Sequence, residues 1–585
     1  MSTSSSSGLK SIILASSVGT LIEWYDFYIF GSLATILSNQ FFPKENPTAA
    51  FLATLATFAA GFVVRPFGAL FFGRLGDIVG RKYTFMVTLV LMGGATFAIG
   101  LVPKYETIGF FAPLIVLILR LLQGLALGGE YGGAATYVAE HSPEGQRGFW
   151  TSWIQITATA GLFISLGVIL ITKNAMEKAN WEDWGWRIPF LVSIIMVFVS
   201  VLIRKNMAES PLFAKAKAEG KTSVNPLKES FGNKLNFKFV LLALFGATMG
   251  QGVVWYTGQF YAQTFLLKIM NIDFDQANSL LIIALMLGTP FFVFFGWLSD
   301  KIGRKPIMLT GMLLAVLCYR PIYEKMYQTI NLENKKEIIS KTKIDTKNEI
   351  ASKLNKVDCQ ITTTEMNFED GTTCKIVKKE QIGKGNAQKV ESTKVVKINQ
   401  SDKWTLIWLI FCQLFFVTMA YGPIAAYLVE LFPVKIRYTS MSLPYHIGNG
   451  VFGGLMPAIA TYLVGQAKDL QSPNFYLSGL TYPIIIASIC FVIGLLYSPP
   501  ESNGRFTIPF IKPLKRVLGF VWIILAVATA YFGIWILGIP KITSGIQEDL
   551  VFGIIIMFVL TPIVTGGLLI FGKYALEGAY DNEAV

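Results

Sequence analysis

Charged residues are scarce in this sequence. Asp, Glu, Lys and Arg make up 15% of its 585 residues, whereas hydrophobic residues make up 53%, and the mean hydropathy is +0.52. This balance excludes a string of ordinary soluble domains and indicates a protein that crosses a membrane many times. The net charge of +13 does not indicate nucleic-acid binding, because the basic residues lie mostly in short turns between apolar runs and in one polar block.

Motifs for catalysis and for metal or nucleotide binding are also missing. The only histidines, His141 and His446, are too few and too far apart for a metal site. There is no glycine-rich phosphate-binding motif, which argues against an ATP-driven pump, and no nucleophile, base and orienting group can be assembled. We therefore expect a protein that is not an enzyme and that needs no metal or cofactor other than a proton as coupling ion.

The apolar runs predict fourteen membrane-spanning helices, because a span needs about 20 predominantly apolar residues. They fall into two groups of six and a terminal hairpin. The first six lie near 11–37, 50–72, 83–102, 110–138, 148–172 and 188–203. The next six lie near 239–268, 278–298, 306–323, 404–432, 438–465 and 480–498, and the hairpin lies near 517–540 and 551–572. The predicted fold class is an all-α polytopic membrane protein.

Two repeated motifs show that the two groups of six are copies of one unit. GRLGDIVGRK at Gly73–Lys82 returns as GWLSDKIGRK at Gly296–Lys305, 223 residues later. Glu140 and Arg147 return with the same spacing as Glu430 and Arg437, 290 residues later. The second offset is larger by 67 residues, so a segment is inserted between Lys305 and Glu430. The polar block at 322–402 is the evident insertion.

These boundaries divide the chain into six segments. We expect an N-terminal bundle, a cytoplasmic linker, a C-terminal bundle in two parts that flank the insertion, and an extra hairpin with a tail. The N-terminal bundle is predicted at 1–205 and the cytoplasmic linker at 206–238. The C-terminal bundle is predicted at 239–321 and 403–505, with the insertion at 322–402 between its parts, and the hairpin with its tail at 506–585. Lys and Arg fall on alternate short loops, which predicts that both termini are cytoplasmic and that the insertion faces outward.

The sequence of the insertion predicts a small extracytoplasmic module that contains β-strands. Apolar and polar residues alternate in CQITTTEMNFEDGTTCKIVKK, and Asp370-Gly371 is a turn signal. Cys359 and Cys374 flank this hairpin, and a disulfide between them is possible in an oxidising compartment. The alternative is a disordered loop with two free thiols.

The motifs resemble those of a known family. The repeated G-x-x-x-D-x-x-G-R-K motif between two six-helix halves is similar to that of the major facilitator superfamily, whose halves pack about a central substrate cavity. EWYDFYIFG, RPFGALFFGRLGD, RLLQGLALGGEYGGA and WRIPF, which start at Glu23, Arg65, Arg120 and Trp186, resemble the metabolite:proton symporters within it. That group includes carriers for proline and betaine, 2-oxoglutarate, citrate and shikimate.

Two features of the chain depart from the family pattern, and two short motifs also resemble another family. AESP at Ala208 and PPES at Pro499 resemble motifs of the related sugar porters, which leaves a sugar carrier open. The family pattern has neither the outer module nor the two last helices. Neither departure touches the helices that would line the cavity.

Ionisable residues within the spans are candidate functional residues, because they are costly there. Glu23 and Asp26 share one face of the first helix, and burial disfavours the charged form of a carboxyl whereas a nearby Arg favours it. We expect proton coupling on Asp26 and Glu23. Arg65 and Arg120 would oppose these acids or hold a substrate carboxylate, because a guanidinium forms a planar fork. An equally good alternative for Arg65 is a purely structural ion pair with a carboxylate of the first helix.

Glu130 is a second candidate proton site, and a hydrogen bond that packs two helices is the alternative. The second half has fewer charges at matching positions, because Trp24-Tyr25-Asp26 aligns with Trp255-Tyr256-Thr257. We expect this half to contribute polar aromatic surface, which also suits quaternary ammonium groups. Ordinary packing is the alternative for each aromatic. The substrate-binding candidates are Arg120, Arg65, Tyr25, Trp255, Tyr256, Gln259 and Tyr421.

The repeated motifs are interpreted as parts of a cytoplasmic gate. Each Asp precedes the basic pair by four residues at a predicted helix end, where it can cap the next helix or pair with an Arg of the other half. A simple positive-inside anchor is the alternative, but it does not explain the Asp in both copies. The gating candidates are Asp77, Arg81, Glu140, Arg147, Asp300, Arg304, Glu430 and Arg437.

The sequence thus predicts a proton-coupled symporter that imports a small polar solute by alternating access. Acids and bases in one cavity favour a carboxylate or a zwitterion, such as 2-oxoglutarate, proline or betaine, over a sugar. A sensor that uses the outer module is the alternative from another class. The resemblance implies a bacterial inner membrane as the location, and we expect a monomer, although the sequence leaves the oligomeric state open.

Overall fold

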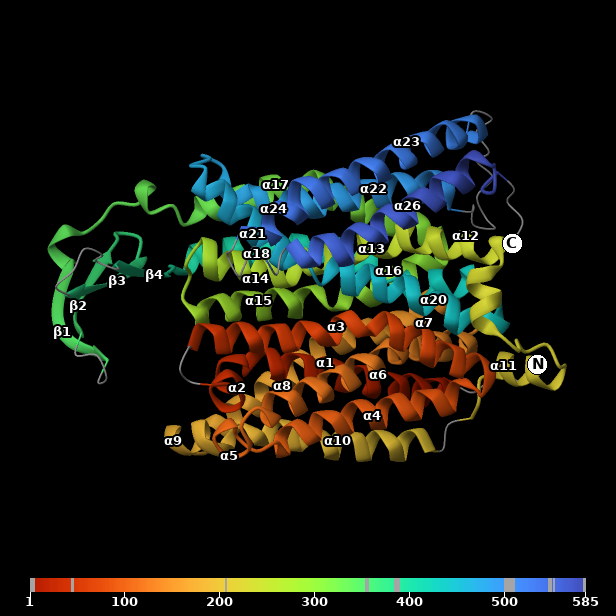
Figure 1. Cartoon of the computed structure of the whole chain (residues 1–585), viewed down its shortest axis with the longest axis horizontal. Helices are drawn as coiled ribbons and strands as arrows, with labels where there is room; N and C mark the ends of the chain where they lie inside the picture. The colour runs from red at the N-terminus through yellow and green to blue at the C-terminus, as the bar shows by residue number, and fades with distance from the viewer. Residues whose placement is uncertain are drawn as a thin grey trace.

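The computed structural model describes the chain except for residues 1–5, 44–46, 206–207, 353–356, 383–389, 499–510, 545–549, 551–552 and 582–585. It is a long bundle of helices with a small sheet at one end, and the short helix at Pro211–Ala218 (α11) lies at the opposite end (Figure 1). We call these the sheet end and the gate end.

The N-terminal half contains six membrane-length helical rods at the positions of the first six predicted spans. Three short helices lie between these rods. The rods are α1 (Ser6–Ser32), α3 (Pro47–Ile78), α4 (Arg81–Leu101), α6 (Phe111–His141), α7 (Arg147–Ser152) continued by α8 (Ile156–Asn174), and α10 (Arg187–Lys205). The short helices are α2 (Ala34–Phe41), α5 (Tyr105–Ile108) and α9 (Lys178–Asn180).

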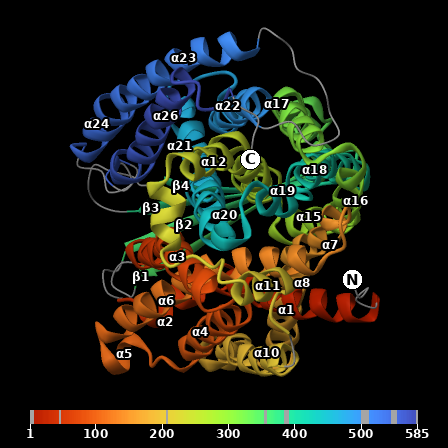
Figure 2. The same cartoon turned by 90° about the vertical axis from the view of Figure 1, so that its right-hand side faces the viewer.

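The C-terminal half repeats this arrangement, and α11 (Pro211–Ala218) lies in the linker before it. Its first rod joins α12 (Lys234–Ala243), α13 (Met249–Tyr256) and α14 (Ala262–Thr264), and its second joins α15 (Phe274–Gly288) and α16 (Pro290–Ile302). The others are α17 (Arg304–Thr329), α18 (Gln400–Tyr421) with α19 (Ile424–Leu431), α20 (Arg437–His446) with α21 (Met456–Asp469), and α22 (Thr481–Tyr497). Figure 2 shows the two halves side by side, with the C-terminal hairpin on the outer flank of the second half.

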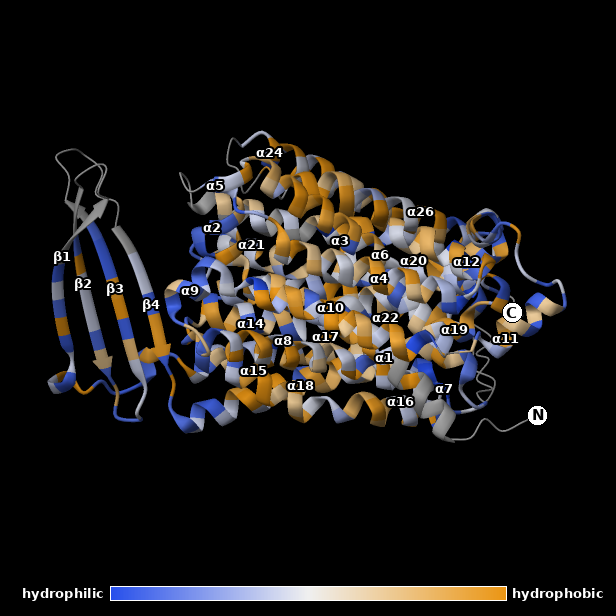
Figure 3. Ribbon diagram, turned by 90° about the horizontal axis from the view of Figure 1, so that it is seen from below, coloured by the Kyte–Doolittle hydropathy of each residue, from blue (hydrophilic) through white to orange (hydrophobic). Residues whose placement is uncertain are grey.

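The rods have the length and composition of membrane spans. Among the described residues, twelve helices from Arg81 onward are long and apolar enough to cross a membrane, and α1 and α3 precede them. Hydrophobic residues cover the bundle between its two ends (Figure 3). The predicted fold class, with two six-helix halves and extra C-terminal helices, is confirmed.

The extra hairpin packs closely because small residues line its crossings. It consists of α23 (Ile511–Tyr531), α24 (Ile539–Ile542) and α26 (Thr561–Leu576). A Cβ on Gly519 would lie 2.9 Å from the carbonyl oxygen of Gly572, so only glycine permits this approach. The hairpin also contacts the second half, where the indole of Trp522 donates to the hydroxyl of Tyr497 (3.0 Å).

The insertion folds into a four-stranded antiparallel sheet of consecutive strands. The strands are β1 (Lys343–Ser352), β2 (Val357–Asn367), β3 (Thr373–Ile382) and β4 (Val390–Lys397). Gly371 turns the chain between β2 and β3 with φ = 86°, a conformation that favours glycine. The predicted β-containing module with its Asp370-Gly371 turn is confirmed, and β1 lies farthest from the helices (Figure 3).

The register of the sheet excludes a disulfide between Cys359 and Cys374, which the sequence had left open. Cys359 is paired with Gln381 and Cys374 with Met366 on the β2–β3 ladder. The two cysteines are therefore seven residues apart along it, roughly 23 Å at about 3.3 Å per residue, whereas a disulfide needs Cα atoms within about 7 Å. Cys374 is a buried free thiol.

A polar cluster holds the sheet on the helices. The ammonium of Lys335 lies 2.5 Å from a carboxylate oxygen of Asp370 and 2.5 Å from one of Asp402, the latter in the first turn of α18. Backbone bonds add to this anchor, because the N–H of Asp273 donates to the carbonyl of Val396 (2.9 Å). Since α17 continues to Thr329, the predicted boundary at 322 falls within a helix, and the inserted segment begins after it.

Asp370 should make the attachment of the sheet sensitive to acid. Burial opposes ionisation of its carboxyl, but bonds from Lys335 and Thr372 outweigh this effect and lower its pKa from 3.8 to about 2. A lowered pKa means that the folded state favours the carboxylate, so this stabilisation is present above about pH 4 and is lost as the pH falls towards 2. We predict that Asp370→Asn speeds amide exchange in β2 and β3 at pH 7, and that the difference from the unmodified protein shrinks towards pH 3. An equal difference at both pH values would contradict this role.

Candidate functional site

At the gate end, the acid of the first repeated motif caps a helix of the other half. Asp77, at the end of α3, accepts hydrogen bonds from the N–H groups of Tyr438 (3.4 Å) and Thr439 (2.8 Å) in the first turn of α20. A carboxylate is favourable there because the first N–H groups of a helix lack partners within it. Arg81 lies 2.9 Å from the same carboxylate, and both side chains are fully buried.

The second copy of the motif makes the reciprocal contact. Asp300, at the end of α16, accepts from the N–H groups of Gly148 (2.8 Å) and Phe149 (2.7 Å) at the start of α7, and Arg304 lies 2.6 Å from it. Gly148 and Phe149 are 290 residues before Tyr438 and Thr439. Each half therefore caps the matching helix of the other half.

The second repeated motif adds ion pairs between the halves, and the two copies differ in burial. Glu140 lies 2.9 Å from Arg437 of the other half and 3.7 Å from Arg81, with its side chain fully buried. Glu430 lies 3.1 Å from Arg304 and 3.9 Å from Arg147, but its side chain is 35% exposed. The structure thus brings together all eight residues that the sequence assigned to a gate.

Glycines allow the two halves to touch at this end. A Cβ on Gly73 would lie 2.9 Å from the Cα of Thr439, and a Cβ on Gly296 would lie 2.4 Å from the Cβ of Ser152. These glycines are the first residues of the two copies of the motif. Close helix contact and paired charges together keep the halves in contact at the gate end.

The linker contributes residues that the sequence reasoning did not include. A carboxylate oxygen of Glu209 accepts from the N–H of Arg81 (3.2 Å), and the hydroxyl of Ser210 donates to Glu140. The guanidinium of Arg81 lies over the ring of Phe213, 4.4 Å from its centre. The AESP motif was the signal for this contact, but we had used it only as a resemblance to sugar porters.

Within the first half, Asp26 lies in a closed polar network. Arg120 lies 3.1 Å from one oxygen of Asp26, and the amide of Gln123 donates to the other (2.9 Å). Gln123 also accepts from Arg120 (2.7 Å) and donates to Thr96 (2.8 Å). Both oxygens of Asp26 are therefore occupied. Gln123 and Thr96 were missed, because uncharged polar residues give no signal in an apolar run.

Glu23 lies in a looser arrangement about one turn away. Arg65 is 3.7 Å from one of its oxygens, which is longer than a good hydrogen bond. The other oxygen of Glu23, the Nε of Arg65, the Nε2 of His446 and the indole nitrogen of Trp255 are buried without a hydrogen-bond partner among the described residues. Such groups are costly when buried unless a ligand or water satisfies them.

Glu130 lies outside this region. Arg204 of α10 lies 2.8 Å from one oxygen, and the hydroxyl of Thr88 donates to the other (2.9 Å). Gly19 of α1 lies against the pair, because a Cβ there would be 2.2 Å from the carboxylate. This geometry matches the alternative of a bond that packs helices. Arg204 lies just beyond the predicted span at 188–203, but in the structure it is in the last turn of α10 and is fully buried.

Aromatic residues join the two halves at mid-depth. The rings of Trp24 and Trp255, which are equivalent in the two halves, lie 4.9 Å apart. Trp255 also lies 6.3 Å from Tyr421 and 4.8 Å from Tyr256, while Gln259 is buried one turn along the same rod. Tyr25 is placed differently from its prediction, because its hydroxyl donates to the carbonyl of Pro189 within the first half (2.6 Å).

A second aromatic contact involves residues that the sequence reasoning missed. Tyr131 stacks on Tyr445 with ring centres 3.7 Å apart. The amide of Gln155 donates to Tyr131 (2.9 Å), and the hydroxyls of Tyr421 and Tyr445 are 2.7 Å apart. Tyr131 and Gln155 are 290 residues before Tyr421 and Tyr445, so the repeat offset would have found both pairs.

Comparison with known proteins agrees with this arrangement. The fold is that of the major facilitator transporters: a solved structure of a proton:xylose symporter aligns with a TM-score of 0.57 and 17% identity, covering 84% of this chain and 95% of that one. Residues 12–344 match the family model for sugar (and other) transporters. The chain belongs to this transporter family. Residues 511–582 match a family of unknown function (DUF6814), which covers the extra hairpin.

Relatives within this family carry charged organic solutes. The proline/betaine transporter of Escherichia coli is 29% identical over 505 residues, covering 83% of each chain. The citrate-proton symporter of Klebsiella pneumoniae is 28% identical over 488 residues, covering 83% of this chain and 90% of its own. The predicted resemblance to metabolite:proton symporters is confirmed.

The burial difference between Glu140 and Glu430 predicts unequal effects of matched variants. Glu140→Gln leaves Arg437 in a buried site without its acid, and breaking a buried pair costs about 3–5 kcal/mol. Glu430→Gln removes a partly exposed pair worth about 0–1 kcal/mol. We expect Glu140→Gln to open the gate end. Ser442 is buried between the halves, so Ser442→Cys serves as a probe. Combined with Glu140→Gln, this cysteine should react with a maleimide at least roughly tenfold faster than it does in protein that keeps Glu140.

The test uses protein whose five native cysteines are replaced by serine. Glu430→Gln is the matched control and should leave the reaction rate of Ser442→Cys nearly unchanged. Equal rates in both variants would show that the buried pair does not hold the gate end closed.

Proposed function

We propose that the chain is a proton-coupled symporter that imports a small zwitterion or carboxylate, such as proline, betaine or 2-oxoglutarate, by alternating access. The observation that carries this proposal is the group of unpartnered polar atoms on Glu23, Arg65, His446 and Trp255, buried between the halves. Both signs of charge occur in this region. A zwitterion or carboxylate fits such a site better than a sugar does, and the relatives that carry proline, betaine and citrate support this choice.

Arg120 links proton and substrate in this proposal. It lies 3.1 Å from Asp26, and a guanidinium held by an internal carboxylate is not free for another. When Asp26 takes up a proton, it no longer neutralises Arg120, which can then hold a substrate carboxylate. Loss of the proton restores the internal pair and releases the substrate. Binding of a proton therefore favours binding of the solute, which is the condition for symport.

Glu23 and Arg65 have a second role in this scheme. Their 3.7 Å separation and their unpartnered atoms leave both groups available to a ligand. The unpaired oxygen of Glu23 suits an ammonium group, and the faces of Trp24 and Trp255 suit it as well, because aromatic faces attract cations. Tyr256, Gln259 and Tyr421 line the second half of this region. Tyr25 and Glu130 are structural residues in this proposal.

In this proposal, the gate residues close the transport pathway at the gate end. The eight gate residues hold the halves together at one end in this state, and their contacts would break when that side opens. The basic loops support a cytoplasmic gate end, with both termini inside and the sheet outside. The bacterial relatives support an inner membrane, where the chain would act as a monomer.

Asp26→Asn tests the coupling. Because Asn cannot take up the proton, we expect uptake in proteoliposomes to lose its response to an inward proton gradient. Exchange of labelled for unlabelled solute without a gradient should continue, because the site itself remains. The panel of solutes is proline, betaine, 2-oxoglutarate and citrate.

Asp183→Asn, at an exposed position of the sheet end, is the matched control and should keep the full gradient response. Gradient-driven uptake by Asp26→Asn at the rate of the unmodified protein would remove Asp26 from the mechanism.

A further inference from the structure

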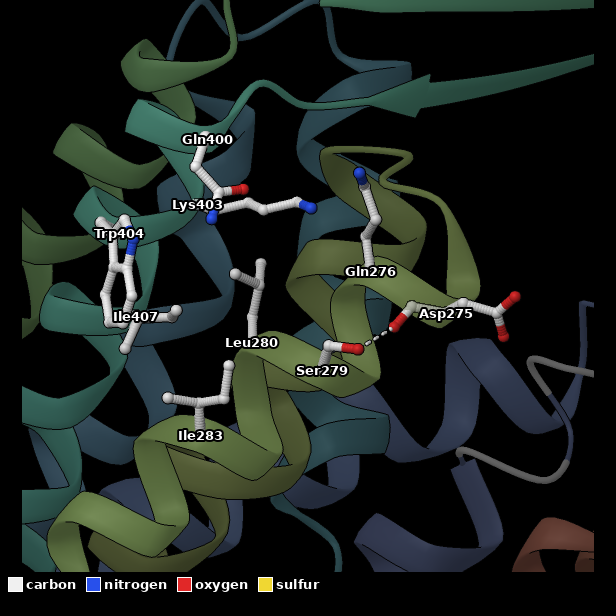
Figure 4. Close-up of a pocket in the computed structure, with 9 residues that line it drawn as sticks. All are labelled: Asp275, Gln276, Ser279, Leu280, Ile283, Gln400, Lys403, Trp404 and Ile407. Carbon is white, nitrogen blue, oxygen red and sulfur yellow. Dashed lines mark hydrogen bonds between the residues drawn. The ribbon is translucent and has the colours of Figure 1, made fainter. Parts of the chain in front are cut away.

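A pocket lies between α15 and α18 at the sheet end, within the second half. It is bounded above by the linker from β4 to α18, and Figure 4 shows the side chains around it. The lining residues are Asp275, Gln276, Ser279, Leu280, Ile283, Gln400, Lys403, Trp404 and Ile407. None of them takes part in the gate or in the proposed transport site.

The surroundings place this pocket on the lipid-facing surface. Phe274 is 65% exposed, Trp404 56% and Trp408 62%. In a chain that crosses a membrane, such large exposed apolar side chains face the bilayer. Tryptophan is typical of the boundary between the hydrocarbon and the headgroups, so Trp404 marks the depth of the pocket at that boundary.

The pocket changes from polar to apolar with depth. Gln276, Gln400 and Lys403 lie on the side near the sheet, whereas Leu280, Ile283 and Ile407 lie on the side towards the bundle centre (Figure 4). This order matches an amphiphile whose headgroup lies at the membrane surface and whose chain enters the hydrocarbon.

Lys403 gives the polar side a positive charge that no acid neutralises. Its side chain extends across the pocket, and Asp275 turns its carboxylate away (Figure 4). The neighbouring Asp402 is bound to Lys335 (2.5 Å), and no ion pair of Lys403 within 4 Å occurs in the part of the chain that the structure describes. A basic side chain near a membrane surface attracts anionic lipid groups.

The roof of the pocket is held in place by the insertion. The N–H of Ile398 donates to the side chain of Gln276 (2.8 Å), and the amide of Gln276 donates back to the carbonyl of Ile398 (3.3 Å). These reciprocal bonds fix the α15 wall against the segment between β4 and α18. The headgroup side is therefore preformed, which lowers the cost of binding.

We propose that this pocket binds one phospholipid of the leaflet at the sheet end. Its phosphodiester lies on Lys403, and an acyl chain lies against Leu280, Ile283 and Ile407. The site is independent of the transport proposal, because it shares no residue with the transport site.

The test is native mass spectrometry of the full chain in detergent, titrated with phosphatidylglycerol. Lys403→Gln should weaken the tightest lipid-binding event roughly fivefold, and Lys403→Arg should restore it. Ile283→Trp, which fills the apolar part, should weaken it as well. Lys397→Gln removes an exposed lysine of β4 at the same end and is the matched control, with no expected change.

Millimolar inorganic phosphate distinguishes a lipid from a soluble anion. We expect phosphate not to displace the lipid, because it cannot occupy the apolar part. Displacement by phosphate would contradict the proposal and indicate a soluble anion site. Equal lipid binding by Lys403→Gln and Lys397→Gln would also overturn it. If Lys403→Gln is unstable, equal binding by Ile283→Trp and the unmodified protein decides against the proposal.

Discussion

The structure depends on one constraint: a charge buried in a membrane protein needs a partner. This chain satisfies the constraint in two different ways. At the gate end, charges find partners across the contact between the halves, as Asp77 does with α20 and Asp300 with α7. Within the first half, Asp26 and Arg120 are partners of one another. Pairs of the first kind join the two halves, whereas the second kind lies within one half, and we propose that it responds to a proton.

The two halves kept their shared gate but diverged at mid-depth. The cap made by Asp77 recurs at Asp300 on the equivalent backbone N–H groups. By contrast, Asp26 of the first half corresponds to Thr257, an uncharged residue whose hydroxyl donates to the carbonyl of Val253 on its own rod (2.6 Å). The tyrosine pairs are partly shared. Tyr131 corresponds to another tyrosine, Tyr421, whereas the position of Gln155 corresponds to Tyr445. The buried charges at mid-depth are thus concentrated in the first half, where we propose that the proton binds.

Much of the fold could be predicted from the sequence. Span length and the two repeat offsets were sufficient for the bundle, the insertion and the hairpin, because they depend on hydrophobicity and spacing alone. The eight gate residues were found for the same reason. Which residues pair was not predictable, since Glu140 and Arg437 are 297 positions apart and meet only when the halves pack.

Errors arose where a small change in geometry decides the outcome. Tyr25 faces the interior of its own half because successive residues on a helix point about 100° apart, so a neighbour of a site residue can face away from the site. The cysteines of the insertion fail to meet because register, which the sequence did not fix, separates them along the ladder. Arg204 pairs with Glu130 within the bundle because α10 extends two residues beyond the expected span, to Lys205.

The most direct measurement joins the halves at the gate end. Thr136 and Met441 belong to different halves, and the hydroxyl of the first lies 3.2 Å from the sulfur of the second. In protein without native cysteines, Thr136→Cys/Met441→Cys would be treated with a short membrane-permeant thiol crosslinker. If the halves must separate there in each cycle, crosslinking stops solute uptake, reductant restores it, and neither single variant responds. Uptake that continues at full rate in the crosslinked protein would contradict the account.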